Sequence, residues 1–253
     1  MASHRNGSRW MTLIAFTSLF MVVGVCLRLS WWQLERAEEK RIWLAQQAER
    51  SAMTPASLDA LLNDASPLHR SARLEGVVDN AHPVLLDNRT LNGIAGYHLL
   101  SPMQTHSGLW VLINRGWLPR GASRQILPDI PSVEGNLVVT GTVYHTSGSP
   151  FVLQEEELPD NQWPLRVQKV DFGAIGEKLG VELAPFEIRV TPELALGGLT
   201  PLPRHWQDVT PMGPERHKAY ALQWLCLAIA ALVIFLFAAS RAQRKRLTQQ
   251  QGR

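Results

Sequence analysis

The sequence predicts a membrane protein of the α+β class, in which two transmembrane helices flank a β-rich extracytoplasmic domain. Two uncharged apolar segments, Met11–Leu27 and Ala219–Ser240, predict the helices, because about 20 predominantly apolar residues span a bilayer core. Between them, short runs of β-branched and aromatic residues alternate with turn residues. Short strands with few helices predict a largely antiparallel sheet or partial barrel.

Charge sets the expected orientation of the chain in the membrane. All 22 acidic residues lie between the two spans, whereas the terminal segments carry only cations. Short cationic segments stay on the cytoplasmic side, so both termini are expected inside and the central domain outside. The predicted boundaries are a cytoplasmic tail at 1–9, spans at 10–29 and 219–240, a periplasmic domain at 30–218, and a basic cytoplasmic tail at 241–253.

The first apolar run also has features of a cleaved signal peptide. Arg5 and Arg9 precede it, as in the basic region of such peptides. No small-residue cleavage site follows the run. Cys26 is also unlike a lipoprotein cysteine, because such a cysteine usually follows a small residue and Cys26 follows Val25. We therefore expect a retained anchor.

The central domain is expected to contain three helical and seven extended segments. Trp31–Arg50 is rich in helix formers and is expected to continue the first span, and Ser57–Leu62 and Asp171–Leu179 predict short helices. The expected strands are Ala72–Val78, Pro83–Asp87, Tyr97–Ser101, Leu109–Trp117, Leu137–Tyr144, Leu165–Val170 and Phe186–Val190. The strand around Leu109–Leu118 is apolar on both faces, which predicts a strand covered on both sides, and Gly116 in it would allow a bulge.

Common catalytic signatures are missing from the sequence, so we expect that the protein is not an enzyme. No G-x-S-x-G, P-loop, H-E-x-x-H or C-x-x-C motif is present, and both cysteines, Cys26 and Cys226, fall within the spans. The acidic run Glu155–Glu157 reads as a solvated loop. The sequence pI near 9.1 reflects the basic tails, so no nucleic-acid partner is expected.

The start of the second span carries the most suggestive residues. His217, Tyr220, Trp224 and Ala228 follow one another at intervals of three or four and are expected on one helical face. One interpretation is an aromatic belt with an interfacial histidine. The other is a haem site, in which a neutral imidazole binds the iron and Arg36, Lys40 and Arg216 meet carboxylates near the headgroups.

Five motifs, in order along most of the chain, resemble the Surfeit-locus protein 1 family, which assists assembly of cytochrome c oxidase. They are Trp32-Gln33-Leu34-x-Arg36-x-x-x-Lys40, Arg73-x-x-Gly76, Leu85-Leu86-Asp87-Asn88-Arg89-Thr90 with Gly96-Tyr97-His98-Leu99-Leu100-Ser101-Pro102, Val111-Leu112-Ile113-Asn114-Arg115-Gly116-Trp117-Leu118-Pro119, and His217-x-x-Tyr220-Ala221-x-x-Trp224. Ser101 and Ile113 are mild departures from the family pattern.

The resemblance implies a two-span protein of the bacterial inner membrane that helps to mature the oxidase core subunit by holding and delivering haem a. It places haem binding at His217, as a ligand of the iron, and the helical face described above adds Tyr220 and Trp224 as expected cofactor-binding residues. The core subunit is the expected partner, and haem a synthase is a further candidate. The alternative is a scaffold that docks on the nascent oxidase without binding haem.

Two interpretations also remain open for Arg115 and Trp117. Arg115 either anchors a sheet edge or stacks on the indole, or both residues lie, with Arg36, on a surface that meets the oxidase.

Overall fold

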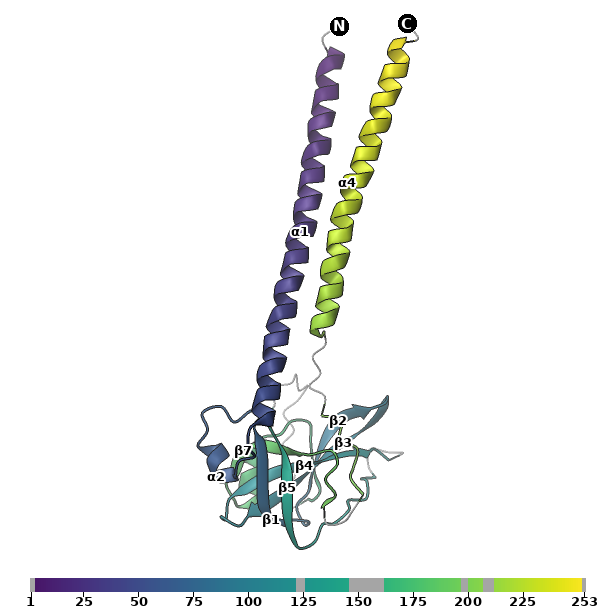
Figure 1. Cartoon of the computed structure of the whole chain (residues 1–253). Helices are drawn as coiled ribbons and strands as arrows, with labels where there is room; N and C mark the ends of the chain where they lie inside the picture. The colour runs from purple at the N-terminus through teal and green to yellow at the C-terminus, as the bar shows by residue number, and fades with distance from the viewer. Residues whose placement is uncertain (1–2, 122–125, 146–161, 197–199, 207–211, 252–253) are drawn as a thin grey trace. The chain divides into compact units, whose positions relative to one another are not determined.

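The computed structural model describes residues 3–121, 126–145, 162–196, 200–206 and 212–251. The chain forms two compact units: a helical unit of residues 1–45 and 209–253, and a β unit of residues 46–208. Figure 1 shows the helices and strands of both units. The expected acidic loop Glu155–Glu157 lies outside the described residues.

Two long helices, α1 (Ser3–Ala52) and α4 (Pro214–Gln251), supply the helical unit. Both are long and apolar enough to cross a membrane, over Trp10–Ala52 and Pro214–Arg244. As expected, α1 continues without a break beyond its apolar part. The contacts Phe16–Phe235 and Ser30–Ala221 show that the two helices run antiparallel.

The β unit contains one mixed sheet of seven strands in the order β1-β5-β7-β4-β3-β2-β6. The strands are β1 (Ser71–Val78), β2 (Val84–Leu91), β3 (Ile94–Thr105), β4 (Trp110–Pro119), β5 (Asn136–Tyr144), β6 (Leu165–Val167) and β7 (Leu183–Val190). An additional β1–β3 pairing closes a circuit of five strands, which agrees with the prediction of a largely antiparallel sheet or partial barrel. Most pairings are antiparallel, but β2–β6 and β4–β7 are parallel.

All seven expected strands are present, but β2, β3 and β7 are longer than predicted and β6 is shorter. β6 ends at Val167 rather than Val170, because it pairs only with Val84–Leu86 of β2 and β2 is irregular immediately afterwards. There Asn88 has a positive φ of 59°. β3 is longer than expected because different parts of it pair with β2, β4 and β1.

Strand β4 lies at the centre of the sheet and is buried on both faces, as predicted. Val111 and Ile113 pack in one hydrophobic cluster together with α2 (Leu58–Leu62). Leu112 packs in a second cluster together with α3 (Phe172–Leu179). The two short helices therefore cover opposite faces of the sheet.

Both short helices begin at a side chain that accepts a hydrogen bond from the helix backbone. Ser57 Oγ accepts from the N–H of Ala60, and Asp171 Oδ1 accepts from the N–H of Ala174. Gly180 ends α3 in the left-handed conformation, with φ of 68°. These caps confirm both helices within a residue of the predicted starts.

The predicted bulge of β4 lies at Arg115–Gly116, opposite Leu99 and Leu100 of β3. Gly116 has φ of +130°, a conformation that only glycine adopts without strain. An added Cβ would lie 2.7 Å from Cβ of Leu202 and 3.0 Å from the carbonyl oxygen of Pro203. The segment 200–206 therefore packs directly on the bulge.

We predict that Gly116→Ala destabilises the β unit by about 2 kcal/mol or more, because backbone strain and a close contact act together. Hydrogen exchange of β4 amides in the purified full chain measures this loss. Gly93→Ala is the matched control, since Gly93 also has a positive φ but an added Cβ would meet nothing within 4 Å. Equal protection of β4 amides in wild type and Gly116→Ala would contradict the prediction.

Candidate functional site

The two long helices face each other through small and polar residues within the helical unit. On α4 the buried residues His217, Ala221 and Ala228 share one face with half-buried Trp224. On α1 the corresponding buried or half-buried residues are Cys26, Ser30, Gln33 and Ala37. Small residues let helix backbones approach closely in a membrane, where apolar burial gives helices no preference for each other over lipid.

His217 is held between the helices by a hydrogen bond to the first span. Its Nδ1 lies 2.7 Å from Oε1 of Gln33, and only 9% of the residue is exposed. Within the described part of the chain, Nε2 makes no hydrogen bond and is not completely enclosed. The imidazole is thus fixed through one nitrogen, while the other keeps some accessible surface.

On the predicted face of α4, His217 and Ala228 are buried and Trp224 is half-buried, whereas Tyr220 is exposed. Tyr220 is 44% exposed, in contrast to its neighbour Ala221, which is buried. Trp31 and Trp32 on α1 are exposed as well. Whether Tyr220 and Trp224 contact a cofactor stays a prediction.

Arg36 lies on the exposed surface of α1 with partners on its own helix. Its guanidinium is 2.6 Å from Glu39 and 5.9 Å from the ring centre of Trp32. Lys40 lies 5.6 Å from the ring centre of Trp43. Half of the Arg36 side chain remains exposed, so these contacts leave it accessible.

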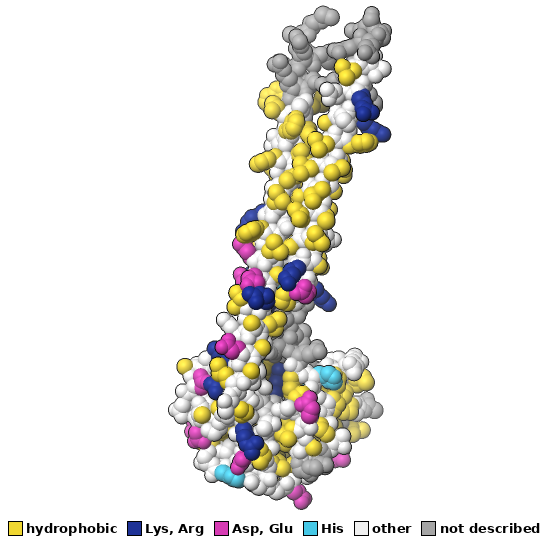
Figure 2. All heavy atoms as spheres, viewed as in Figure 1, with side chains coloured by type: hydrophobic (Ala, Val, Ile, Leu, Met, Phe, Trp, Pro, Cys, Tyr) yellow, Lys and Arg dark blue, Asp and Glu magenta, His cyan; other side chains and the backbone are white. Residues whose placement is uncertain are grey.

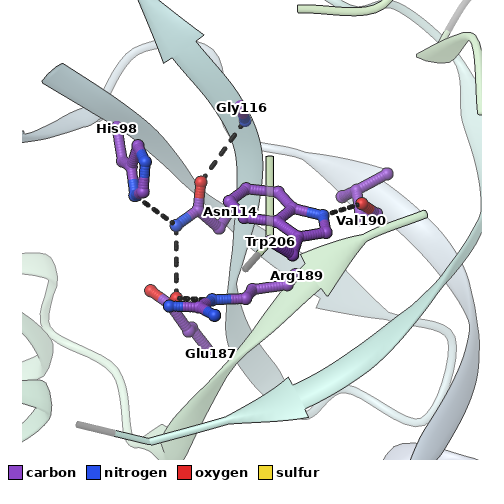
Figure 3. A network of polar contacts seen from close by, with 7 residues as sticks. All are labelled: His98, Asn114, Gly116, Glu187, Arg189, Val190 and Trp206. Carbon is purple, nitrogen blue, oxygen red and sulfur yellow. Dashed lines mark hydrogen bonds and ion pairs between the residues drawn. The ribbon is translucent and has the colours of Figure 1, made fainter. Parts of the chain in front are cut away.

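A second polar constellation lies within the β unit and connects β3, β4 and β7 (Figure 3). Asn114 on β4 is its centre: Nδ2 donates to Glu187 at 3.2 Å and lies 3.5 Å from Nδ1 of His98. Its Oδ1 accepts from the backbone N–H of Gly116. One asparagine side chain thereby links β3, β7 and the bulge of β4.

Arg189 on β7 completes this network by combining an ion pair with aromatic contacts. Its Nε donates to Glu187 at 3.3 Å, and its guanidinium carbon lies 3.1 Å from the ring centre of Tyr144 on β5. Trp206 lies against Arg189 and against the ring of His98, and donates from its indole N–H to the carbonyl of Val190. Trp206 thus covers the network from the segment that precedes α4.

Burial shifts the pKa values of two members, each in the direction of its neutral form. Removal from water raises the pKa of Glu187, opposed by Arg189 and the hydrogen bond from Asn114. Burial, with the positive charges of Arg89 and Arg189, lowers the pKa of His98 to about 4. His98 is therefore neutral at physiological pH.

Arg115 is a buried structural residue in the β unit, with 3% of its surface exposed. Its Nη2 donates to the carbonyl of Pro131 at 2.7 Å. Its own carbonyl accepts from Nε of Arg204, which also donates to carbonyls that follow β7. Burial, with a smaller effect of Arg204, lowers the pKa of Arg115 to about 10. Arg115 therefore anchors two loops on the sheet.

Trp117 is likewise mostly buried, and its indole N–H donates to the carbonyl of Arg89 rather than meeting Arg115. These contacts favour the structural interpretation of Arg115 and Trp117. A contact of either residue with the oxidase stays a prediction.

Sequence reasoning did not identify Glu187, Arg189, Arg204 or Trp206. In Phe186–Val190 the charged residues alternate with apolar ones, a pattern typical of a half-exposed strand. The sequence does not show that Trp206 covers Arg189 on this strand or that Glu187 is buried. Among the described residues, no group of three or more His, Cys, Asp or Glu side chains is arranged to hold a metal ion.

Comparisons with known proteins agree along most of the chain. Residues 20–229 match the family model described as SURF1 family. A SURF1-like protein of Rickettsia conorii is 24% identical over 222 residues, which cover 86% of this chain and 88% of the relative. Surfeit locus protein 1 of Arabidopsis thaliana is 30% identical over 131 residues, which cover 46% of this chain and 36% of the relative.

We predict that Glu187→Ala destabilises the β unit by about 3 kcal/mol or more, because Arg189 and Asn114 lose their common acceptor in a buried setting. Glu187→Gln keeps an acceptor oxygen and is expected to cost less. Thermal unfolding of the purified full chain measures both. Glu75→Ala, at an exposed glutamate of β1, is the control and is expected to change stability by less than about 0.5 kcal/mol. A Glu187→Ala variant as stable as this control would refute the role.

We also predict that His98 contributes to acid destabilisation. In the unfolded chain His98 binds a proton near its ordinary pKa of 6.5, whereas in the folded chain it binds one only near a pKa of about 4. Between these values the unfolded state holds more protons, so each unit of acidification costs up to about 1.4 kcal/mol.

The variant His98→Gln removes this contribution, so its unfolding free energy should fall less than that of wild type between pH 6.5 and 4.5. Comparing the two chains cancels the effect of Glu187, which has the opposite sign because its pKa is raised. His106→Gln, at an exposed histidine, is the control. Identical pH slopes in wild type and His98→Gln would refute the prediction.

Proposed function

The chain belongs to the SURF1 family of cytochrome c oxidase assembly factors, and from this premise we propose that it holds haem a at the start of α4 and delivers it to the oxidase core subunit. The observation that carries the proposal is an imidazole that α1 and α4 hold between them through Nδ1, with Nε2 making no hydrogen bond among the described residues.

The residues around His217 fit a haem group. A neutral imidazole nitrogen is a common axial ligand of haem iron. Ala221 and Trp224 follow His217 on the same face, so the surface beside the ligand is apolar and includes a flat ring. Bound haem would supply the iron that the imidazole coordinates. This chain would orient the imidazole and provide apolar side chains beside the macrocycle.

Charged residues near His217 suit the anionic edge of the macrocycle. Arg36 and Arg216 are exposed, and Lys40 is half-buried, all within the helical unit. Cationic side chains form charge-assisted hydrogen bonds with carboxylates. In the proposal they bind the haem carboxylates while the apolar ring faces Trp224 and Tyr220.

The proposed location is a bacterial inner membrane, with both termini in the cytoplasm and the β unit in the periplasm. The distribution of charge supports this orientation, because all acidic residues lie between the spans. Hydrophobic side chains cover the helices over the predicted spans, and lysine and arginine side chains follow on α4 (Figure 2). Haem a would then be held at the outer surface of the bilayer.

Delivery of a cofactor requires no bond-making by this chain, so the proposal needs no catalytic residues. The oxidase core subunit is the proposed recipient, and haem a synthase is the proposed source. Arg36 is accessible for a partner contact, whereas Arg115 and Trp117 are buried within the β unit and would support a contact surface of that unit from inside.

A scaffold without haem is the second candidate, and the low exposure of His217 favours it. A buried histidine bonded to a glutamine of the neighbouring helix is also a common way to join two membrane helices. In this case the β unit docks on the nascent oxidase, and His217 only stabilises the helix pair.

We predict that the full chain, purified from cells that make haem a, carries haem and that His217→Ala loses most of it, because the iron loses its ligand. Absorbance spectra and the haem-to-protein ratio measure the change. His205→Ala, at an exposed histidine outside the helical unit, is the control. Colourless wild-type protein that still co-purifies with the oxidase core subunit would reject haem holding and favour the scaffold.

We predict further that a membrane-impermeant reagent added to intact spheroplasts reacts with the β unit. In a chain with Cys26→Ala and Cys226→Ala, a membrane-impermeant maleimide should label Ala65→Cys but not Ala242→Cys in intact spheroplasts, since both positions are exposed in the structure. Labelling of both after lysis is the control. The reverse pattern in intact spheroplasts would overturn the proposed orientation.

A further inference from the structure

We infer that Gln33 is the positioning residue of the haem site: it accepts the Nδ1 proton of His217, so that Nε2 presents its lone pair to the iron. The inference rests on the proposed function and names the residue that prepares its ligand. Gln33 lies on α1 and His217 on α4, so the contact joins residues far apart in sequence.

The chemistry follows from the two atoms in contact. The Oε1 of Gln33 is a carbonyl oxygen and can only accept, so the ring nitrogen 2.7 Å away carries the proton. A neutral imidazole has one N–H, and Nε2 is then unprotonated. An unprotonated nitrogen is what iron requires, whereas the opposite tautomer would place a proton toward the metal.

The contact also fixes the direction of the ring. Metal-binding histidines commonly donate their second N–H to a carboxylate or carbonyl group, which sets tautomer and orientation and makes the ligand more basic. Gln33 is half-buried and His217 is buried, so water competes poorly for this hydrogen bond. Nε2 makes no hydrogen bond among the described residues and is not completely enclosed, so it is the nitrogen left to bind a metal.

A second hydrogen bond between the same helices allows helix pairing to be tested separately. Oγ of Ser30, which is also buried, donates to the carbonyl of Ala221 at 2.9 Å. It lies one turn from Gln33 on α1, and its acceptor lies one turn from His217 on α4. Loss of the Ser30 bond weakens helix contact without touching the imidazole.

In the test, the purified full chain in detergent is titrated with haemin. The haemin affinity of each variant is compared with the residual affinity of His217→Ala. Gln33→Leu removes the acceptor and is expected to weaken haemin binding by about ten- to a hundredfold, as is typical for residues that orient a metal ligand. Gln33→Glu keeps an acceptor and should bind haemin. Its bound iron should have a lower midpoint potential than in wild type, because an anionic acceptor makes the imidazole more electron-donating.

Two controls separate positioning from structure. Ser30→Ala removes an interhelical hydrogen bond, and Gln223→Leu replaces an exposed glutamine of α4; both should bind haemin as wild type does. Wild-type affinity in Gln33→Leu, or an equal loss in Ser30→Ala, would overturn the inference. An unchanged midpoint potential in Gln33→Glu would also count against it, since a purely structural role does not move the potential.

A measurement without haem distinguishes failure of this inference from failure of the proposed function. Nitrogen NMR of the ¹⁵N-histidine-labelled full chain, with His217 assigned by comparison with His217→Ala, reports which ring nitrogen is protonated. The Nδ1–H form is expected in wild type and Gln33→Glu, and its preference should disappear in Gln33→Leu. An Nε2–H form in wild type would overturn the inference, whereas haemin binding no stronger than the His217→Ala baseline would overturn the proposed function instead.

Discussion

Strand β4 is covered on both faces and carries polar side chains that are buried there. Much of the β unit provides hydrogen-bond partners for these side chains. Asn114 and Arg115 are almost completely enclosed. A buried polar group without a hydrogen bond costs about 1 to 3 kcal/mol, so each must be satisfied internally. Asn114 obtains Glu187 and the bulged backbone, while Arg115 obtains the carbonyl of Pro131. The loops and β7 are thereby held at defined places on the sheet.

The same constraint acts in the helical unit, where the surrounding medium is a bilayer in the proposed location. Apolar residues do not favour helix over lipid contact there, so small residues and interhelical hydrogen bonds decide how α1 and α4 pair. Ser30 and His217 each bond to the opposite helix. His217 differs because an imidazole has a second nitrogen, which remains available after the first is satisfied. One contact can therefore both join two helices and prepare a ligand.

In the proposed function, the helical unit binds haem and the β unit contacts the protein partner. The helical unit carries the apolar, flat-ring and cationic groups that a haem macrocycle requires, while the β unit offers a rigid body for protein contact. Within the β unit, Glu187 and His98 are both shifted toward neutrality by burial. Their network links β3, β4 and β7 within the sheet.

The sequence by itself determined the elements that depend on local pattern. Apolar runs and uniform tail charge indicated the two long helices, alternation and turn residues located all seven strands, and Ser57, Asp171 and Gly116 identified two helix starts and one bulge. Tertiary structure alone decided what depends on partners far along the chain: the parallel pairings of β6 and β7, the early end of β6, and the burial of Glu187 and Arg189. It also decided that Tyr220 is exposed and that Gln33 meets His217. The physical reason is that backbone propensity acts over a few residues, whereas burial and hydrogen-bond partners are set by surfaces that only the folded chain brings together.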